Sequence, residues 1–252
     1  MCRFPVEYGR YIEVFGGGGW VLFHKPPGGM EVYNDFNELL VNLYRCVREH
    51  PEELIDKLRY VLNSRTDFEA VRKKLNRSEA SGDIERAAWF YQIVRFSYGS
   101  ALKSYGGQPH DIWDDFPLIR EASRRLGDVV VENRDFQPLI RQYDREDAFF
   151  YCDPPYHTTE NYYQNIGEGG FAEADHIRLR DTLAGIQGKF LLSYNDDEFI
   201  RELYDRPEFH IESISRLDNL RQRYDPNAQF SELFISNYDT EERRRLQLSL
   251  FD

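Results

Sequence analysis

The sequence predicts an α/β fold in which a sheet is interrupted by a helical insertion. The chain starts with a strand, a glycine-rich turn, a helix, a second strand and an acid, an order typical of a mononucleotide-binding βαβ unit. The middle, about residues 59–127, is polar with a helical pattern and few strand signals, and strand patterns return after it. A chain of 252 residues is long enough for one large α/β domain with an insertion, or for two small domains.

The βαβ unit begins with a strand over residues 11–15 that runs into four glycines at 16–19. The glycines do not form the dinucleotide pattern G-x-G-x-x-G, because Val21 and Leu22 occupy the positions of the last glycine. They still allow a backbone to approach a ligand closely at the head of a helix that starts near residue 20. A second strand over residues 31–33 follows, and then apolar residues recur at helical spacing: Phe36, Leu39, Leu40, Leu43, Tyr44 and Val47.

Strands and helices alternate again in the second half of the chain. The apolar run at residues 148–152 is bounded by charge, which is typical of a buried strand. The pattern predicts further elements in this order: a strand at 129–131, a helix at about 174–186, a strand at 189–194, a helix after Asp196 and a strand at 232–236.

Bulk properties exclude several classes of protein. Apolar residues make up 41% of the chain, enough for a substantial core, but no apolar stretch approaches the roughly 20 residues that span a bilayer. The start of the chain lacks the apolar region of a signal peptide. The three cysteines and the histidines show no metal-ligand spacing, so we expect free thiols in a reducing cytoplasm and no metal site. The net charge of −12 argues against a protein that binds nucleic acid over its whole surface, but it is compatible with a local basic groove.

The most informative motif is Asp153-Pro154-Pro155-Tyr156, directly after the buried strand at 148–152. Ligands of open α/β sheets bind at the carboxyl ends of strands. An ionised aspartate only accepts hydrogen bonds, two prolines leave carbonyl oxygens without N–H groups, and a tyrosine ring offers a flat face. The motif therefore predicts a holder for an exocyclic amine on an aromatic base. The alternative is an ordinary Asp-Pro turn.

Two further acids lie at predicted strand ends. Asp35 lies 19 residues after Gly16, where an acid can bind ribose hydroxyls, although Asn34 and Asp35 could also cap the next helix. Asp135 follows the strand at 129–131 and precedes Phe136. A carboxylate there could accept a hydrogen bond from an adenine amino group while the ring flanks the base.

Taken in order, these motifs resemble the Dam-type DNA adenine-N6 methyltransferases, the alpha class of the D12 family. The resemblance covers about residues 11–238 and rests on the segments 13–18, 34–37, 133–136, 151–156, 191–195 and 232–237. It implies a class I methyltransferase Rossmann-like sheet with a helical target-recognition insertion. Residues 1–58 and 128–240 would form the catalytic domain, 59–127 the insertion and 241–252 a tail. The resemblance also implies a cytoplasmic enzyme of bacteria or prophages, of the restriction-modification kind.

Carried over to this chain, the family implies S-adenosylmethionine at Phe15-Gly16-Gly17-Gly18. Asp35 would hold the ribose, and Asp135 and Phe136 would flank the adenine of the cofactor. The target adenine would be flipped out of double-stranded DNA, with its N6–H groups on the Asp153 carboxylate and the Pro154 carbonyl, and with Tyr156 stacked on the base.

Relatives usually begin with a short Gly-Gly-Lys segment that contacts the methionine part of the cofactor, and Met1 follows where that segment would end. Either the true start lies upstream or this protein lacks the element. A catalytically silent DNA-binding or clamp-associated relative is therefore the alternative. The intact Asp153 motif argues against it, because a silent protein has no need of an amine holder.

The insertion supplies candidates for DNA contacts. Its first part, 59–77, is rich in Arg and Lys, and residues 86–110 contain no acid but include Arg95, Lys103 and Tyr105. A solvated helix face is the alternative for the basic cluster. The tail residues Gln247, Leu248, Leu250 and Phe251 resemble the peptide that binds the bacterial sliding clamp, unless the tail packs on its own domain.

Overall fold

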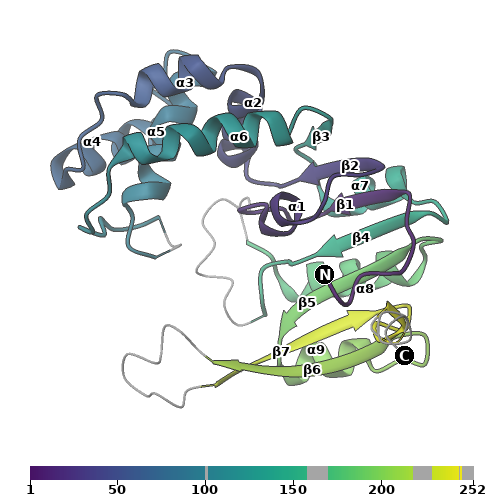
Figure 1. The fold of residues 1–252 in the computed structure, drawn as a ribbon. Helices are drawn as coiled ribbons and strands as arrows, with labels where there is room; N and C mark the ends of the chain where they lie inside the picture. The colour runs from purple at the N-terminus through teal and green to yellow at the C-terminus, as the bar shows by residue number, and fades with distance from the viewer. Residues whose placement is uncertain (100–101, 158–169, 218–228, 244, 246–252) are drawn as a thin grey trace.

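The computed structural model describes residues 1–99, 102–157, 170–217, 229–243 and 245 (Figure 1). These residues form one seven-stranded sheet with the order β3-β2-β1-β4-β5-β7-β6. Neighbouring strands run parallel except β7, which is antiparallel to both β5 and β6. The sheet confirms the predicted Rossmann-like α/β fold. Its strands are β1 Arg10–Glu13, β2 Met30–Asn34, β3 Val129–Glu132, β4 Ala148–Cys152, β5 Lys189–Asn195, β6 His210–Leu217 and β7 Gln229–Ser236.

The helices form two groups. In Figure 1, α7, α8 and α9 lie behind the sheet, whereas α3 to α6 gather above β2 and β3. No helix among the described residues is long and apolar enough to cross a membrane. The helices are α1 Trp20–His24, α2 Glu38–Glu49, α3 Pro51–Leu58, α4 Arg65–Asn76, α5 Asp83–Phe96, the 3-10 helix η2 Ile112–Asp115, α6 Phe116–Arg125, α7 Phe136–Tyr143, α8 Glu173–Ala184 and α9 Glu198–Tyr204.

Each face of the sheet has its own hydrophobic core, because successive strand side chains point to opposite faces. Ile12 and Phe150 pack with residues of α7, α8 and α9. Tyr11 and Phe149 point to the other face and share one core with residues of α2, α3, α5 and α6. The helical part of the chain is therefore continuous with the core on one face of the sheet. The domain boundary at residue 59 stays a prediction; α3, which precedes it, packs against α5 and α6.

A buried ion cluster also joins α6 to the sheet. The Arg125 guanidinium donates to both carboxylate oxygens of Glu31 on β2, at 2.6 and 2.9 Å. It also donates to the Leu22 carbonyl at 2.8 Å. The Lys25 ammonium pairs with the same carboxylate, and both Lys25 and Glu31 are buried. A buried acid with two basic partners fixes where α6 meets the strands.

Strand β6 and the helices α3 and α7 were not expected from the sequence. Strand β6 lies at the edge of the sheet, and none of its residues 210–215 is buried, so it gives little apolar alternation. Helix α7 is only eight residues long and contains a proline in its first turn, so its periodic signal is short. The other predicted strands and helices are present, and β7 begins at Gln229, ahead of the expected residue 232.

Candidate active site

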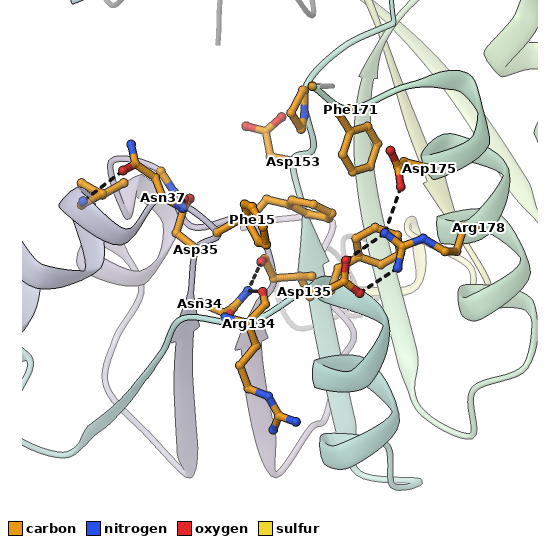
Figure 2. A pocket seen from close by; sticks show the side chains of 17 residues that line it. Phe15, Asn34, Asp35, Asn37, Arg134, Asp135, Asp153, Phe171, Asp175 and Arg178 are labelled. Carbon is orange, nitrogen blue, oxygen red and sulfur yellow. Dashed lines mark hydrogen bonds and ion pairs between the residues drawn. The ribbon is translucent and has the colours of Figure 1, made fainter. Parts of the chain in front are cut away.

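One cavity collects the predicted site residues at the carboxyl ends of four neighbouring strands (Figure 2). The segments that follow β1, β2, β3 and β4 are far apart in the chain, and they meet because these strands are parallel neighbours. The predicted residues that line the cavity are Phe15, Gly17, Asp35, Asp135, Phe136, Asp153 and Pro155. The other predicted residues of this site, none of which lines the cavity as the structure describes it, are Gly16, Gly18, Pro154 and Tyr156.

The turn after β1 requires glycine at two positions for different reasons. A Cβ on Gly16 would lie 2.2 Å from the ring of Tyr33, so the turn can pack against β2 only without a side chain. Gly17 has a φ of 49°, in the left-handed region that favours glycine. A Cβ on Gly17 would meet no atom within 4 Å. Since Gly17 lines the cavity, its bare backbone is open to a ligand.

Asp35 fixes this turn. Its carboxylate accepts hydrogen bonds from the backbone N–H of Gly17 at 2.8 Å and of Asn37 at 2.7 Å. The cap of α2 is Asn37, whose side chain accepts from Leu39 N–H at 3.0 Å. Burial raises the pKa of Asp35, and the two backbone donors act in the opposite direction. Each carboxylate oxygen has two acceptor sites, so Asp35 retains capacity for a donor from a ligand.

Asn34 joins three strand ends. Its side-chain amide donates to the carbonyls of Val14 and Arg134 at 2.8 and 3.1 Å, and its oxygen accepts from the Arg134 N–H at 2.9 Å. The side chain is buried, so these bonds replace its contacts with water. Asn34 therefore holds the segments after β1, β2 and β3 at a constant separation around the cavity.

Three phenylalanine rings form the apolar end of the cavity. The ring centroids of Phe15, Phe136 and Phe171 are 5.7 to 5.8 Å apart in each pair. Phe171 lies just before α8 and was not singled out in the sequence. Separations of this size are typical of aromatic pairs, and an aromatic cluster at the wall of a cavity suits a flat ligand such as a purine.

Asp135 carries an unexpected partner. Arg178 on α8 donates to both of its carboxylate oxygens, at 2.7 and 2.8 Å, and also pairs with Asp175 (Figure 2). The guanidinium lies 4.0 Å from the centroid of the Phe136 ring. Arg178 lowers the pKa of Asp135. Asp135 also caps α7 by accepting from the Gln137 N–H at 3.0 Å. Nothing in the sequence connects Arg178 to Asp135, because only the fold brings α8 beside the end of β3.

The Asp153 motif lies at the rim of the cavity. The Asp153 side chain is exposed and faces the cavity, whereas Pro154 is buried. The Tyr156 hydroxyl donates to Glu232 Oε1 at 3.0 Å and lies 3.4 Å from Ser193 Oγ. The motif thus places its carboxylate toward the cavity while its phenol is fixed on β5 and β7.

A buried glutamate, Glu13, lies beneath the glycine turn that follows β1. Glu13 at the end of β1 is 2% exposed and accepts from the Tyr11 hydroxyl at 2.7 Å and from the Leu22 N–H at 2.8 Å. Burial above all, together with the charge of Asp153, raises the pKa of Glu13 to about 7. Glu13 ties the start of α1 to β1, and its charge is coupled to the proposed amine holder.

The candidate DNA contacts are Arg95 on α5 and, in the segment between α5 and α6, Lys103 and Tyr105. Arg95 donates to Asp115 at 2.7 and 2.8 Å, so its charge is engaged by a buried acid. The Tyr105 hydroxyl donates to Asn63 at 2.7 Å, and Lys103 is exposed. DNA binding by Arg95, Lys103 and Tyr105 stays a prediction. The clamp-like peptide lies at residues 247–251, outside the described residues.

The sheet, with a cavity at the carboxyl ends of its parallel strands, is that of the class I methyltransferase Rossmann-like fold. The chain belongs to the D12 class of N6 adenine-specific DNA methyltransferases, whose family model matches residues 3–222. It is 26% identical to the Type II methyltransferase M1.LlaDCHI of Lactococcus lactis, over 93% of this chain and 88% of the relative. It is also 26% identical to the Type II methyltransferase M.MjaIII of Methanocaldococcus jannaschii, over 91% and 88%. The DNA adenine methylase of Haemophilus influenzae is again 26% identical, over 84% and 80%. The predicted family and the predicted enzyme class are confirmed.

Proposed function

We propose that this enzyme transfers a methyl group from S-adenosylmethionine to N6 of an adenine that is flipped out of a DNA duplex against the Asp153 motif. The main support is the shared cavity, which is lined by Phe15, Asp35 and Asp135 and by Asp153 and Pro155. A methyl donor in this cavity would lie beside the carboxylate that holds the acceptor amine. Such proximity is what a direct transfer between two bound molecules requires.

The side chains of the cavity fit S-adenosylmethionine. The three phenylalanine rings suit the adenine, and Asp135 retains acceptor capacity for its amino group beside the bonds from Arg178. Asp35 would accept from the ribose hydroxyls, and the bare backbone at Gly17 leaves room for the chain beyond the ribose. When bound, the cofactor supplies an electrophilic methyl group on a sulfonium.

The protein's part in the transfer is to prepare the acceptor nitrogen. Adenine N6 is a weak nucleophile because its lone pair is conjugated with the ring. The Asp153 carboxylate and the Pro154 carbonyl would accept hydrogen bonds from its two N–H groups. These bonds favour a lone pair that is localised on the nitrogen and directed at the methyl group. After the transfer N6 carries one proton too many, and the exposed Asp153 can take it and release it to water.

DNA would approach from the rim of this cavity. Extruding a base costs a few kcal/mol of stacking and pairing, and contact with the Tyr156 ring offsets part of that cost. We assign phosphate contacts to the basic residues of 59–127, because the chain as a whole carries a net charge of −12.

The proposal is tested by single-turnover transfer of labelled methyl to unmethylated plasmid DNA. Asp153→Ala should lower the rate by at least about 100-fold, as for removal of one preorganised catalytic group. Folding should be retained, because the side chain is exposed. Asp147→Asn is the matched control: Asp147 precedes the same strand at its opposite end and pairs with Arg10. Full activity in Asp153→Ala would remove the catalytic assignment.

A further inference from the structure

The hydroxyl of Tyr156 is held by a buried polar pair on two other strands. Glu232 on β7 is 3% exposed, and Ser193 on β5 is 2% exposed. The Tyr156 hydroxyl donates to Glu232 Oε1 at 3.0 Å, and Ser193 Oγ donates to the same oxygen at 3.2 Å. Three segments that are distant in the chain therefore meet at one carboxylate oxygen.

This arrangement determines how the Tyr156 ring is presented. The orientation of a tyrosine side chain depends on two torsions. A bond to its hydroxyl fixes the first directly, because the oxygen lies on the axis of the second, and contacts of the ring restrict the second. The ring also contacts Tyr194, with centroids 6.2 Å apart. Because the motif turns sharply after β4, the phenol is anchored within the sheet while the neighbouring Asp153 faces the cavity.

We propose that Glu232 is a positioning residue for methyl transfer, which acts by fixing the Tyr156 ring in the orientation that stacks on the flipped adenine. The inference rests on the proposed function of the Asp153 motif. A carboxylate suits this role better than a neutral group, because it only accepts hydrogen bonds and bonds to a charged acceptor are stronger. It can therefore take the phenol and the Ser193 hydroxyl on one oxygen.

The role predicts effects on chemistry rather than on DNA affinity. Duplex affinity comes mainly from phosphate contacts, which are remote from a side chain buried in the sheet. The stacked base, in contrast, must lie in line with the methyl donor. Loss of the Glu232 bond should therefore slow the single-turnover rate and leave the duplex Kd unchanged within about twofold.

The test is a double-mutant cycle between Tyr156→Phe and Glu232→Ala, with single-turnover transfer to unmethylated plasmid DNA as the readout. Tyr156→Phe keeps the ring and removes only the hydroxyl. Each single variant should lose about 10- to 100-fold in rate, the range expected for a hydrogen bond to a charged group. The double variant should be no more than about twofold slower than the slower single variant, because both changes remove the same bond.

Glu232→Gln keeps the cycle decisive if Glu232→Ala does not fold. The amide retains a carbonyl acceptor, so its rate should fall between wild type and Glu232→Ala, and it should add nothing in the Tyr156→Phe background. Tyr143→Phe is the matched control, since the Tyr143 hydroxyl donates to Glu132 at 2.8 Å in a second tyrosine–glutamate pair. That variant should transfer methyl within about twofold of wild type, because neither Tyr143 nor Glu132 lines the cavity.

The inference is overturned if the two losses multiply in the double variant, if either single variant keeps the wild-type rate, or if the loss appears in the duplex Kd. Failure of the proposed function is a separate result, because it would show as no transfer by the wild-type enzyme. Wild-type transfer together with an unaffected Glu232→Gln and Glu232→Ala would overturn the role of Glu232 alone.

Discussion

Replacing Asp35 by alanine should weaken cofactor binding and stability together. The carboxylate holds the N–H groups of Gly17 and Asn37 at 2.8 and 2.7 Å, and both bonds are lost in Asp35→Ala. Hydrogen bonds to a charged group contribute about 1.5–3 kcal/mol each, and neighbouring bonds are not additive. We therefore expect a loss of roughly 2–4 kcal/mol in the free energy of unfolding.

The same variant should bind S-adenosylmethionine roughly 10- to 100-fold more weakly, because the ribose loses a charged acceptor and the Gly17 turn loses its anchor. The assay is titration calorimetry with S-adenosylmethionine, alongside urea unfolding. Asp144→Ala is the control. Asp144 accepts from the backbone N–H groups of Gln187 and Gly188 at 3.0 Å, but it lies outside the cavity.

The two variants should separate stability from binding. Asp144→Ala should lose a similar amount of unfolding free energy and keep its affinity for S-adenosylmethionine within about twofold, as expected for a site away from the ligand. Undiminished affinity in Asp35→Ala, or an equal loss of affinity in both variants, would refute the assignment of Asp35 to the cofactor site.

Three further predictions concern other charged side chains. Because burial raises the pKa of Glu13 to about 7, the stability that its protonation contributes is complete below its ordinary pKa and is lost as the pH rises through about 7. Wild type should thus lose roughly 2–3 kcal/mol relative to Glu13→Gln between about pH 5 and about pH 8, measured by urea unfolding. Arg178→Gln should weaken binding of S-adenosylmethionine about tenfold in calorimetry, because Asp135 loses its two bonds from the guanidinium. Glu31→Ala should cost about 3–5 kcal/mol in urea unfolding, because Lys25 and Arg125 are left without their buried acid.

Each of these predictions has a contrary outcome. A difference between wild type and Glu13→Gln that does not change with pH would show that Glu13 titrates normally. Unchanged cofactor affinity in Arg178→Gln would place Arg178 outside the binding site. If Glu31→Ala unfolds within about 1 kcal/mol of wild type, the ion cluster does not hold α6 to the sheet.

The acids at the strand ends could be predicted because parallel strands bring their carboxyl ends to one edge. Asp35, Asp135 and Asp153 each follow an apolar strand pattern, and all three line the same cavity. Local patterns were enough for this part of the site. The same reasoning placed the strands β1 to β5 and the helical middle of the chain, whose apolar periodicity is strong.

The contacts between distant segments could not be predicted from local patterns. Arg178 and Phe171 reach the cavity only because α8 packs beside α7, and the polar contact of Tyr156 with Glu232 depends on the antiparallel return of β7. Arg95 was expected to be available to DNA because residues 86–110 contain no acid. Its partner, Asp115, lies just beyond that window and faces α5 through the fold.

The central claim is tested most directly by identifying the nucleoside that the enzyme labels. Unmethylated plasmid DNA would be incubated with the wild-type protein and S-adenosylmethionine carrying a labelled methyl group, then digested and separated into nucleosides. We predict label in N6-methyladenine and in no other nucleoside. Label in a methylated cytosine, or unlabelled DNA from a folded protein that binds the duplex, would contradict the proposed function.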